Sequence, residues 1–315
     1  MPKLSIIIPL YNKEKDIKNT LSSVLAQSFN DFEIIIINDG STDASEEVVK
    51  SILDQRIILF SKKNEGVSFT RNFGVEQANT NNIVFLDADD YWYPNHLKNL
   101  YSLITKFPNH FWFATAYEKK HNVNLITPMS SPVMDLDKNW MGVIPNYFKY
   151  SLIDCLAWTS AVCMKKDFFN SLNGFDTTIT HGAGEDTDLW IRAVLKSPLV
   201  FSNTISARHN LDGSNRISNT PTLKRKYMNL DNYENESNNN YFLKKYLDLN
   251  RYSIALQYKL ANDLDSFKNY TEKIELTNLN KKQRFLLKQN KTVLKLFVMI
   301  QVIFGKYGLD LSSFK

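Results

Sequence analysis

Three carboxylates stand together in the sequence Asp87-Ala88-Asp89-Asp90, directly after the apolar run at residues 83–86. Like charges this close repel one another unless a cation lies between them. Hard divalent cations such as Mg²⁺ and Mn²⁺ prefer carboxylate oxygens and bind phosphate oxygens as well. The cluster therefore predicts a Mn²⁺ or Mg²⁺ site, and a solvated acidic turn is the alternative.

A second group of acids, Glu185, Asp186 and Asp188, opens a segment with helical spacing at residues 185–196. Negative charge at the start of a helix is favoured by the helix dipole and by the unpaired amides of the first turn. That effect alone would account for one of these acids. A structural role and a role in chemistry therefore both stay open for this group.

Both acidic groups need elements that hold them, and the first part of the chain predicts such elements. Short connections join alternating strands and helices, a pattern that predicts an α/β fold with a doubly wound, mainly parallel sheet and flanking helices. Such sheets bind ligands beyond the carboxyl ends of their strands, where the polar clusters 38–43 and 87–90 fall. The expected strands are 4–10, 32–37, 56–61 and 83–86, and the expected helices cover about 17–25, 48–53 and 67–78.

The loop after the first strand lacks a glycine-rich nucleotide motif. Residues 9–14 are Pro-Leu-Tyr-Asn-Lys-Glu, and no G-x-x-x-x-G-K-[ST] occurs in the chain. These absences argue against a dinucleotide-dependent dehydrogenase and against a P-loop enzyme. A phosphate-bearing ligand would then need a metal, a helix N-terminus or basic side chains, among which Lys63 and Arg71 are candidates.

The chain of 315 residues is long enough for two units, and its charge is divided unevenly. Residues 221–315 hold 17 Lys and Arg and 9 Asp and Glu, a net charge of +8, whereas residues 1–220 hold 21 and 24, a net charge of −3. We expect a catalytic domain at 1–220, whose region 111–165 mixes strands and loops, and a basic helical extension at 221–315. A mildly acidic body argues against a nucleic-acid partner.

The extension ends in a basic, amphipathic segment with no acid among its cations, which are Lys281, Lys282, Arg284, Lys288, Lys291 and Lys295. Such a helix suits the surface of an anionic membrane. Packing on the catalytic domain or on a second copy is the alternative, so a homo-oligomer stays open. No signal peptide or run of 18 apolar residues is visible, and two cysteines cannot form a disulfide framework. We therefore expect a cytoplasmic protein, in contact with the inner face of the cell membrane if the helix binds lipid.

Six blocks in order over residues 3–210 resemble the family 2 glycosyltransferases of GT-A fold, of the type that builds bacterial polysaccharides, O-antigens and capsules. Each block alone is weak evidence, but the ordered set is specific. The resemblance covers the predicted catalytic domain and carries no information on which sugar is transferred. The blocks are residues 5–12, 38–43, 64–66 with 71–74, 87–90, 174–176 and 185–186.

The resemblance implies a UDP-sugar donor held at the carboxyl edge of the sheet. Tyr11 would stack near the base and Asp39 would hydrogen-bond it, while Arg71 would pair with a donor phosphate or brace the acidic cluster. Asp89 would ligate the metal, with His209 as an additional contact. The full nucleotide-sugar site implied in this way comprises Pro9, Tyr11, Asn12, Asp39, Lys63, Arg71, Asp87 and Ala88.

The same resemblance implies an inverting, metal-dependent transfer to a hydroxyl of a saccharide, carried on a lipid in many relatives. Asp186 would be the general base, because a sugar hydroxyl is a poor nucleophile until a carboxylate accepts its proton. Glu185 would orient the acceptor or the base. Two alternatives are a nucleotidyltransferase, which usually needs a glycine-rich loop that this chain lacks, and a non-catalytic scaffold subunit, which would not need its acids.

Overall fold

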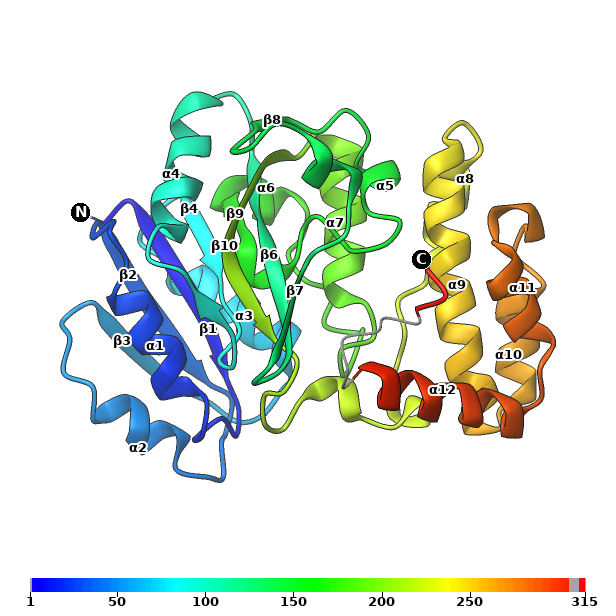
Figure 1. Ribbon diagram of the computed structural model, residues 1–315. Helices are drawn as coiled ribbons and strands as arrows, with labels where there is room; N and C mark the ends of the chain where they lie inside the picture. The colour runs from blue at the N-terminus through cyan, green and yellow to red at the C-terminus, as the bar shows by residue number, and fades with distance from the viewer. Residues whose placement is uncertain (1, 306–311, 315) are drawn as a thin grey trace.

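The computed structural model describes residues 2–305 and 312–314. Strands and helices alternate over the first hundred residues, as the sequence pattern predicts (Figure 1). The elements are β1 (Leu4–Leu10), α1 (Ile17–Leu25), β2 (Phe32–Asn38), α2 (Ser45–Lys50), β3 (Ile57–Ser61), α3 (Val67–Gln77), β4 (Asn82–Phe85), β5 (Tyr91–Trp92) and α4 (His96–Lys106).

The following hundred residues mix strands, short helices and loops. Residues 111–165 contain four strands separated by turns, which agrees with the irregular pattern of their sequence. The expected helix at 185–196 is present. The elements are β6 (Trp112–Asn122), β7 (Leu125–Pro128), β8 (Met141–Val143), α5 (Tyr147–Tyr150), β9 (Val162–Lys165), α6 (Lys166–Ser171), α7 (Glu185–Lys196) and β10 (Val200–Asn210).

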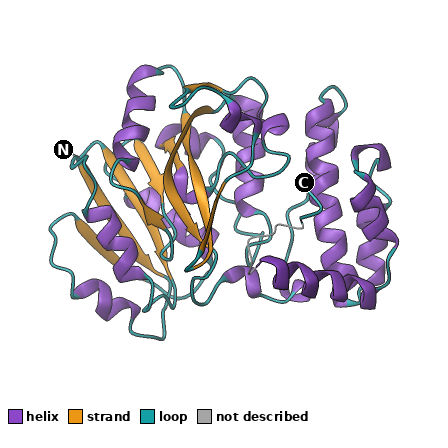
Figure 2. Cartoon of the chain, in the orientation of Figure 1, coloured by secondary structure: helices purple, strands orange, loops and turns teal. Residues whose placement is uncertain are grey.

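These strands form one sheet in the order β3-β2-β1-β4-β9-β6-β10-β5, with β7 added to β6 and β8 added to β10. Strands β3, β2, β1 and β4 are parallel, and β10 is parallel to β6. Strand β9 runs antiparallel to both of its neighbours. Helices lie against the sheet (Figure 2). The predicted α/β architecture is confirmed, and the added antiparallel strands make the sheet mixed.

The central strands are rich in isoleucine because both faces of this sheet are covered. Every residue of β2 is buried, and in β1 only Pro9 is partly exposed. Helix α3 approaches the sheet closely at Gly74, where a Cβ would lie 2.5 Å from the side chain of Ile7 on β1. Glycine at this position therefore allows α3 to lie against the parallel strands.

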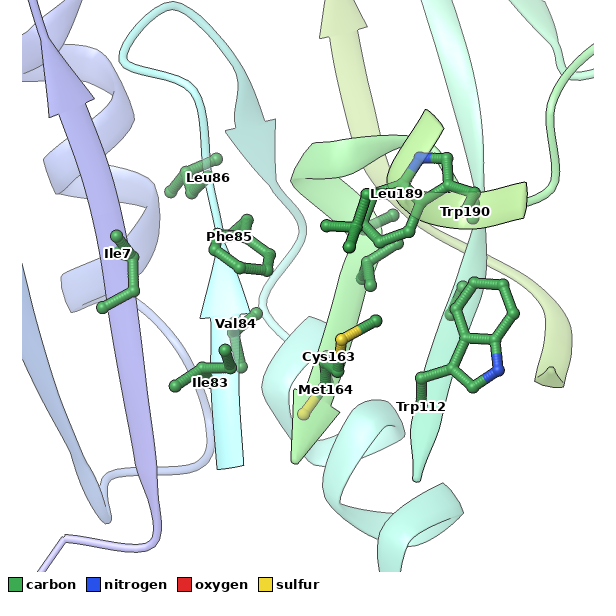
Figure 3. Close-up of a cluster of buried hydrophobic side chains, with 14 of the residues drawn as sticks. Ile7, Ile83, Val84, Phe85, Leu86, Trp112, Cys163, Met164, Leu189 and Trp190 are labelled. Atoms are coloured by element: carbon green, nitrogen blue, oxygen red, sulfur yellow. The ribbon is translucent and has the colours of Figure 1, made fainter. Parts of the chain in front are cut away.

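The core continues across the antiparallel part of the sheet. Figure 3 shows Phe85 of β4 and Met164 of β9 on neighbouring strands, with Trp112 and Trp190 beyond them. The rings of Trp112 and Trp190 are stacked with centroids 5.9 Å apart. Trp190 belongs to α7, so this packing fixes the helix whose first residues are the second acidic group.

Within the described residues, the chain after Asn210 contains helices and no strand, as expected. Helix α9 packs on α5, where the rings of Tyr246 and Phe148 lie 5.5 Å apart. None of the described helices has the length and hydropathy that crossing a membrane would require. The division of the chain at residue 220 stays a prediction. The helices are α8 (Glu234–Ser237), α9 (Tyr241–Ala261), α10 (Leu264–Thr271), α11 (Lys281–Lys288) and α12 (Lys291–Gly305).

Candidate active site

The parallel strands bring the first polar clusters to one edge of the sheet. Leu10, the last residue of β1, pairs with Asn38, the last residue of β2. The amide of Asp39 donates to the carbonyl of Leu10 at 2.8 Å, so Asp39 lies at the carboxyl end of β1 with Tyr11, whose ring is exposed. Strand β4 ends beside them and leads into residues 87–90. This edge is where a doubly wound sheet binds its ligand.

Asp39 is buried and holds the loop that leads into α3. Its carboxylate accepts hydrogen bonds from the amides of Glu65 at 2.9 Å and Gly66 at 3.0 Å, and from the ammonium of Lys62 at 2.5 Å. Lys63, the lysine expected in the donor site, is exposed instead. The neighbouring residue Lys62 is therefore the cation that reaches Asp39, the carboxylate expected to bind the nucleotide base.

Pro9 and Asn12 hold the backbone at the end of β1 and in the loop that follows it. Pro9 is paired with Ile37 in the β1–β2 register, and its part is to extend β1. The side chain of Asn12 accepts from the amide of Thr42 at 2.7 Å, and its amide donates to Ser41 Oγ at 3.0 Å. Asn12 thus ties the loop after β1 to the loop after β2, next to Tyr11.

Arg71 joins the two acidic groups. Its guanidinium is buried, donates to Asp87 Oδ1 at 2.5 Å and lies 4.0 Å from Glu185 Oε1. It also lies over the ring of Phe175, 5.2 Å from the centroid. Asp87 lies two residues after the end of β4 and Glu185 begins α7, so acids about 100 residues apart in sequence meet at one cation. The shared site of Asp89 and Asp186 that the family resemblance implies stays a prediction.

Glu185 is the more enclosed of the two acids that begin α7. Burial raises its pKa to about 7, and the charge of Asp186 adds to the rise while Arg71 opposes it. Its Oε2 atom is buried with no hydrogen-bond partner among the described residues. Asp188, the third acid, is engaged elsewhere: it pairs with Arg192 at 2.6 Å and accepts from the hydroxyl of Tyr233. Asp188 therefore anchors α7 and is not available for chemistry.

The carboxylate of Asp186 accepts a hydrogen bond from the amide of Thr187 at 2.7 Å, and its charge also acts on polar side chains of three other segments. Its charge contributes, after burial, to the raised pKa values of Tyr117, Cys155 and Tyr246. Burial raises the pKa of the Cys155 thiol to about 12, so the thiol stays neutral. Tyr246 belongs to α9. The helical extension thus contributes to the surroundings of the candidate base, which sequence reasoning missed because no local motif marks Tyr246.

Asp89, the candidate metal ligand, is paired with a cation of the protein. Lys13 Nζ donates to Asp89 Oδ2 at 2.6 Å and also to the carbonyl of Ser214. Burial raises the pKa of Asp89, with Asp87 adding to the rise and Lys13 opposing it. Lys13 therefore lies at the carboxylate where the predicted cation would bind, and no motif in the sequence marks this lysine.

Asp90 and Ala88 support the acidic turn from inside. Asp90 is buried and accepts from Ser160 Oγ at 2.6 Å and from the amide of Asn210 at 3.0 Å. Burial raises the pKa of Asp90 well above its ordinary value, and the charges of Asp89 and Asp87 add to the rise. The carbonyl of Ala88 accepts from Thr20 Oγ1 at 3.0 Å. These contacts hold the turn, in which Asp87 and Asp89 are partly exposed and Asp90 is buried.

The carboxylates at this edge can serve a divalent cation that is shared with a substrate. Within residues 2–305 and 312–314, no three His, Cys, Asp or Glu side chains converge as a ready metal cage. Mg²⁺ and Mn²⁺ sites that act on phosphates do not need one, since one or two carboxylates, waters and the substrate's oxygens complete the shell. A polar cavity of about 150 Å³ beside Asp89 is also lined by Asp16, Lys15, Lys120 and Asp212, of which the last two form an ion pair at 2.9 Å. Asp89, with Asp87 nearby, fits a cation held in this way.

His209 lies near this site but is engaged. Its ring is stacked on Trp158 with centroids 5.0 Å apart, and its Nε2 atom faces the guanidinium of Arg216 at 3.3 Å. Burial and the charge of Arg216 lower the pKa of His209 to about 4, and Asp87 opposes them. The imidazole is therefore neutral, which a metal ligand requires, but its lone pair faces Arg216.

Residues 5–169 match the profile of glycosyl transferase family 2. The chain is 29% identical over 225 residues to an uncharacterised glycosyltransferase of Rickettsia conorii, covering 69% of this chain and 36% of that protein. It is 36% identical over 107 residues to the glycosyltransferase GlyA of Streptococcus pneumoniae, covering 33% of this chain and 15% of that protein. The chain thus spans about a third or less of the length of these relatives.

A solved structure, residues 1–349 of Staphylococcus aureus TarS in complex with UDP-GlcNAc, resembles the whole fold. The TM-score is 0.56 at 16% identity, over 90% of this chain and 78% of that one. TarS 1–349 without that ligand gives a TM-score of 0.57 at 18% identity, over 86% and 90% of the two chains. The parallel strands agree with the fold that the family resemblance implies. The chain belongs to glycosyl transferase family 2.

Proposed function

We propose that the protein is an inverting glycosyltransferase that moves a sugar from a UDP-sugar to a hydroxyl of a saccharide acceptor. The observation that carries the proposal is the contact of Arg71 with Asp87 and Glu185, which brings the candidate phosphate-binding edge and the residue next to the candidate base together. The UDP-GlcNAc complex of the structurally similar TarS supports a UDP-sugar as donor.

In this proposal Tyr11 and Asp39 bind the nucleotide base of the UDP-sugar. Arg71 is the cation nearest to its diphosphate. Asp87 and Asp89 would hold Mn²⁺ or Mg²⁺, which when bound offsets negative charge on the diphosphate. Arg216 and Lys13 add positive charge at the same edge. Fixed charges of this kind stabilise a leaving group without reorganisation during the reaction.

Asp186 accepts the proton of the acceptor hydroxyl while the oxygen attacks the anomeric carbon. The bond from that carbon to the diphosphate breaks, and UDP leaves with the electron pair, so the anomeric configuration inverts. Glu185, beside Asp186 and Arg71, positions the base. We propose a saccharide carried on a lipid as the acceptor, in a cytoplasmic setting next to the membrane.

The test begins with thermal shift in Mn²⁺ across UDP-, GDP- and dTDP-sugars, since a bound donor raises apparent stability according to its affinity. Asp186→Asn should lower turnover of that donor by roughly 10²- to 10⁴-fold and leave UDP affinity unchanged. Asp265→Asn, at an exposed first-turn acid of α10, is the matched control. Full turnover by the Asp186→Asn variant refutes the role of Asp186 as the general base. No stabilisation by any nucleotide sugar favours the scaffold, and diphosphate release from a nucleoside triphosphate and a sugar phosphate favours the nucleotidyltransferase.

A further inference from the structure

Helix α12 leaves most of its apolar surface uncovered. Leu294 is the one buried residue among Lys291–Gly305. The consecutive residues 296–299 are all exposed, and four consecutive residues point in all directions around a helix. The exposed apolar side chains of α12 are between 39 and 61% accessible and comprise Leu296, Phe297, Val298, Met299, Val302, Ile303 and Phe304.

The same surface is basic. No acidic residue occurs between positions 276 and 305. Phe285 of α11 is exposed and its ring contacts that of Phe297, so α11 and α12 form one surface, here called the α11–α12 face. The cations on which the argument rests are Lys281, Arg284, Lys288, Lys291 and Lys295.

The charge of the α11–α12 face indicates what binds there. A symmetric dimer would place each copy's face against the same face of the other, and cations without acids would then meet cations. An anionic lipid surface instead offers phosphate groups to the lysines and an apolar layer to the side chains of α12.

The length of α12 decides how it would lie in lipid. Fifteen residues span about 22 Å, which is shorter than a hydrocarbon core of about 30 Å. The helix therefore suits a position within the interface, parallel to the membrane plane, and does not suit a crossing of the bilayer.

Figure 1 places α12 along the lower side of the molecule, and β1, β2 and β3 run toward that same side. The carboxyl ends of these strands carry the candidate donor site. A membrane bound at the α11–α12 face would accordingly lie at the end of the molecule that carries the candidate donor site.

We propose that the α11–α12 face binds the surface of an anionic lipid bilayer. This membrane site extends the proposed function. Only its connection to a lipid-linked acceptor rests on that function. The purified full chain is tested by co-sedimentation with vesicles of phosphatidylcholine alone and with added phosphatidylglycerol. Binding should require the anionic lipid and fall as salt rises.

Two variants separate the apolar and the charged contributions. Phe297→Ser/Met299→Ser/Ile303→Ser should lower partition into anionic vesicles by at least tenfold, and Leu53→Ser/Leu223→Ser/Leu264→Ser, at exposed leucines elsewhere, should not. Lys288→Gln/Lys295→Gln should lower it by roughly 25-fold, at about fivefold per charge. The matched control Lys98→Gln/Lys106→Gln changes exposed lysines of α4, at the opposite side in Figure 1.

Sedimentation equilibrium and donor turnover complete the test. Loss of vesicle binding with unchanged turnover of the UDP-sugar supports the proposal. Equal binding by the variants and their controls overturns it, and so does a dimer that the Phe297→Ser/Met299→Ser/Ile303→Ser variant converts to a monomer. Vesicle binding by a protein that turns over no nucleotide sugar would refute the proposed function and leave the lipid surface standing.

Discussion

Replacing Glu185 with Gln is expected to change how the stability of the protein depends on pH. Burial raises the pKa of Glu185 to about 7, with Asp186 adding to the rise and Arg71 opposing it, against an ordinary value of 4.5. The unfolded chain therefore releases this proton at lower pH than the folded chain does. Between pH 4.5 and 7 the folded state holds more protons, so its stability falls as pH rises through that window.

The magnitude follows from the same interval. One pKa unit corresponds to 1.36 kcal/mol, so the step from 4.5 to about 7 costs the folded state about 3 kcal/mol by pH 8. The side chain that Glu185→Gln introduces cannot ionise, so the variant protein avoids this cost. Its free energy of unfolding relative to the unchanged protein should rise by about 3 kcal/mol between pH 4.5 and pH 8. The attraction of Arg71 for the ionised carboxylate is already contained in the pKa of about 7 and adds no separate contribution.

Urea unfolding followed by tryptophan fluorescence, at half-unit steps from pH 4.5 to 8.5, measures this difference. Glu47→Gln is the matched control, since Glu47 is an exposed first-turn acid of α2 and should give a curve parallel to the unchanged protein. Parallel curves for Glu185→Gln and the unchanged protein would show that Glu185 ionises as an ordinary surface acid. The argument from burial would then be wrong.

Two other substitutions test the cations of the site. Arg71→Met should lower turnover of the donor at least 100-fold and destabilise the fold by about 2–4 kcal/mol, because it leaves Asp87 and Glu185 without their shared cation. The first effect is measured as kcat/KM and the second by urea unfolding. Near-normal turnover would contradict the role of Arg71. Lys13→Met should tighten Mn²⁺ binding roughly fivefold, because it removes an ion pair worth about 1 kcal/mol from Asp89. Isothermal titration calorimetry measures that affinity, and weaker binding would mean that Lys13 assists the cation.

The sequence predicts the parts of the site that follow from strand ends. Alternating strands and helices place residues 38–43 and 87–90 at one edge of a parallel sheet, so the pattern alone is enough to assign Asp39 and Asp87 to that edge. The family resemblance assigns the acids that open α7 to the same reaction, but the strand pattern alone does not place them at this edge. Their link through Arg71 follows from the arrangement of α3, β4 and α7, which the ordered blocks of the family imply.

Other contacts depend on geometry that no local pattern encodes. Lys62 and Lys63 are adjacent and chemically alike, and only the path of the loop decides that Lys62 reaches Asp39. The pairing of Lys13 with Asp89 joins residues 76 positions apart. Tyr246 comes from the helical extension, whose packing on α5 has no signature in sequence. The two-residue strand β5 is too short for alternation to reveal it.

The close approach at Gly74 has a consequence for the whole site. Alanine there would favour an isolated helix by about 1 kcal/mol, yet a methyl group has no room between α3 and Ile7. Tertiary packing overrides the local helix propensity here, because α3 lies directly against the side chains of Ile7 and Ile37 on the sheet. Arg71 lies one turn earlier on α3, so the same packing holds its guanidinium in place. The positive charge that links the turn after β4 to α7 is therefore in position before any ligand binds.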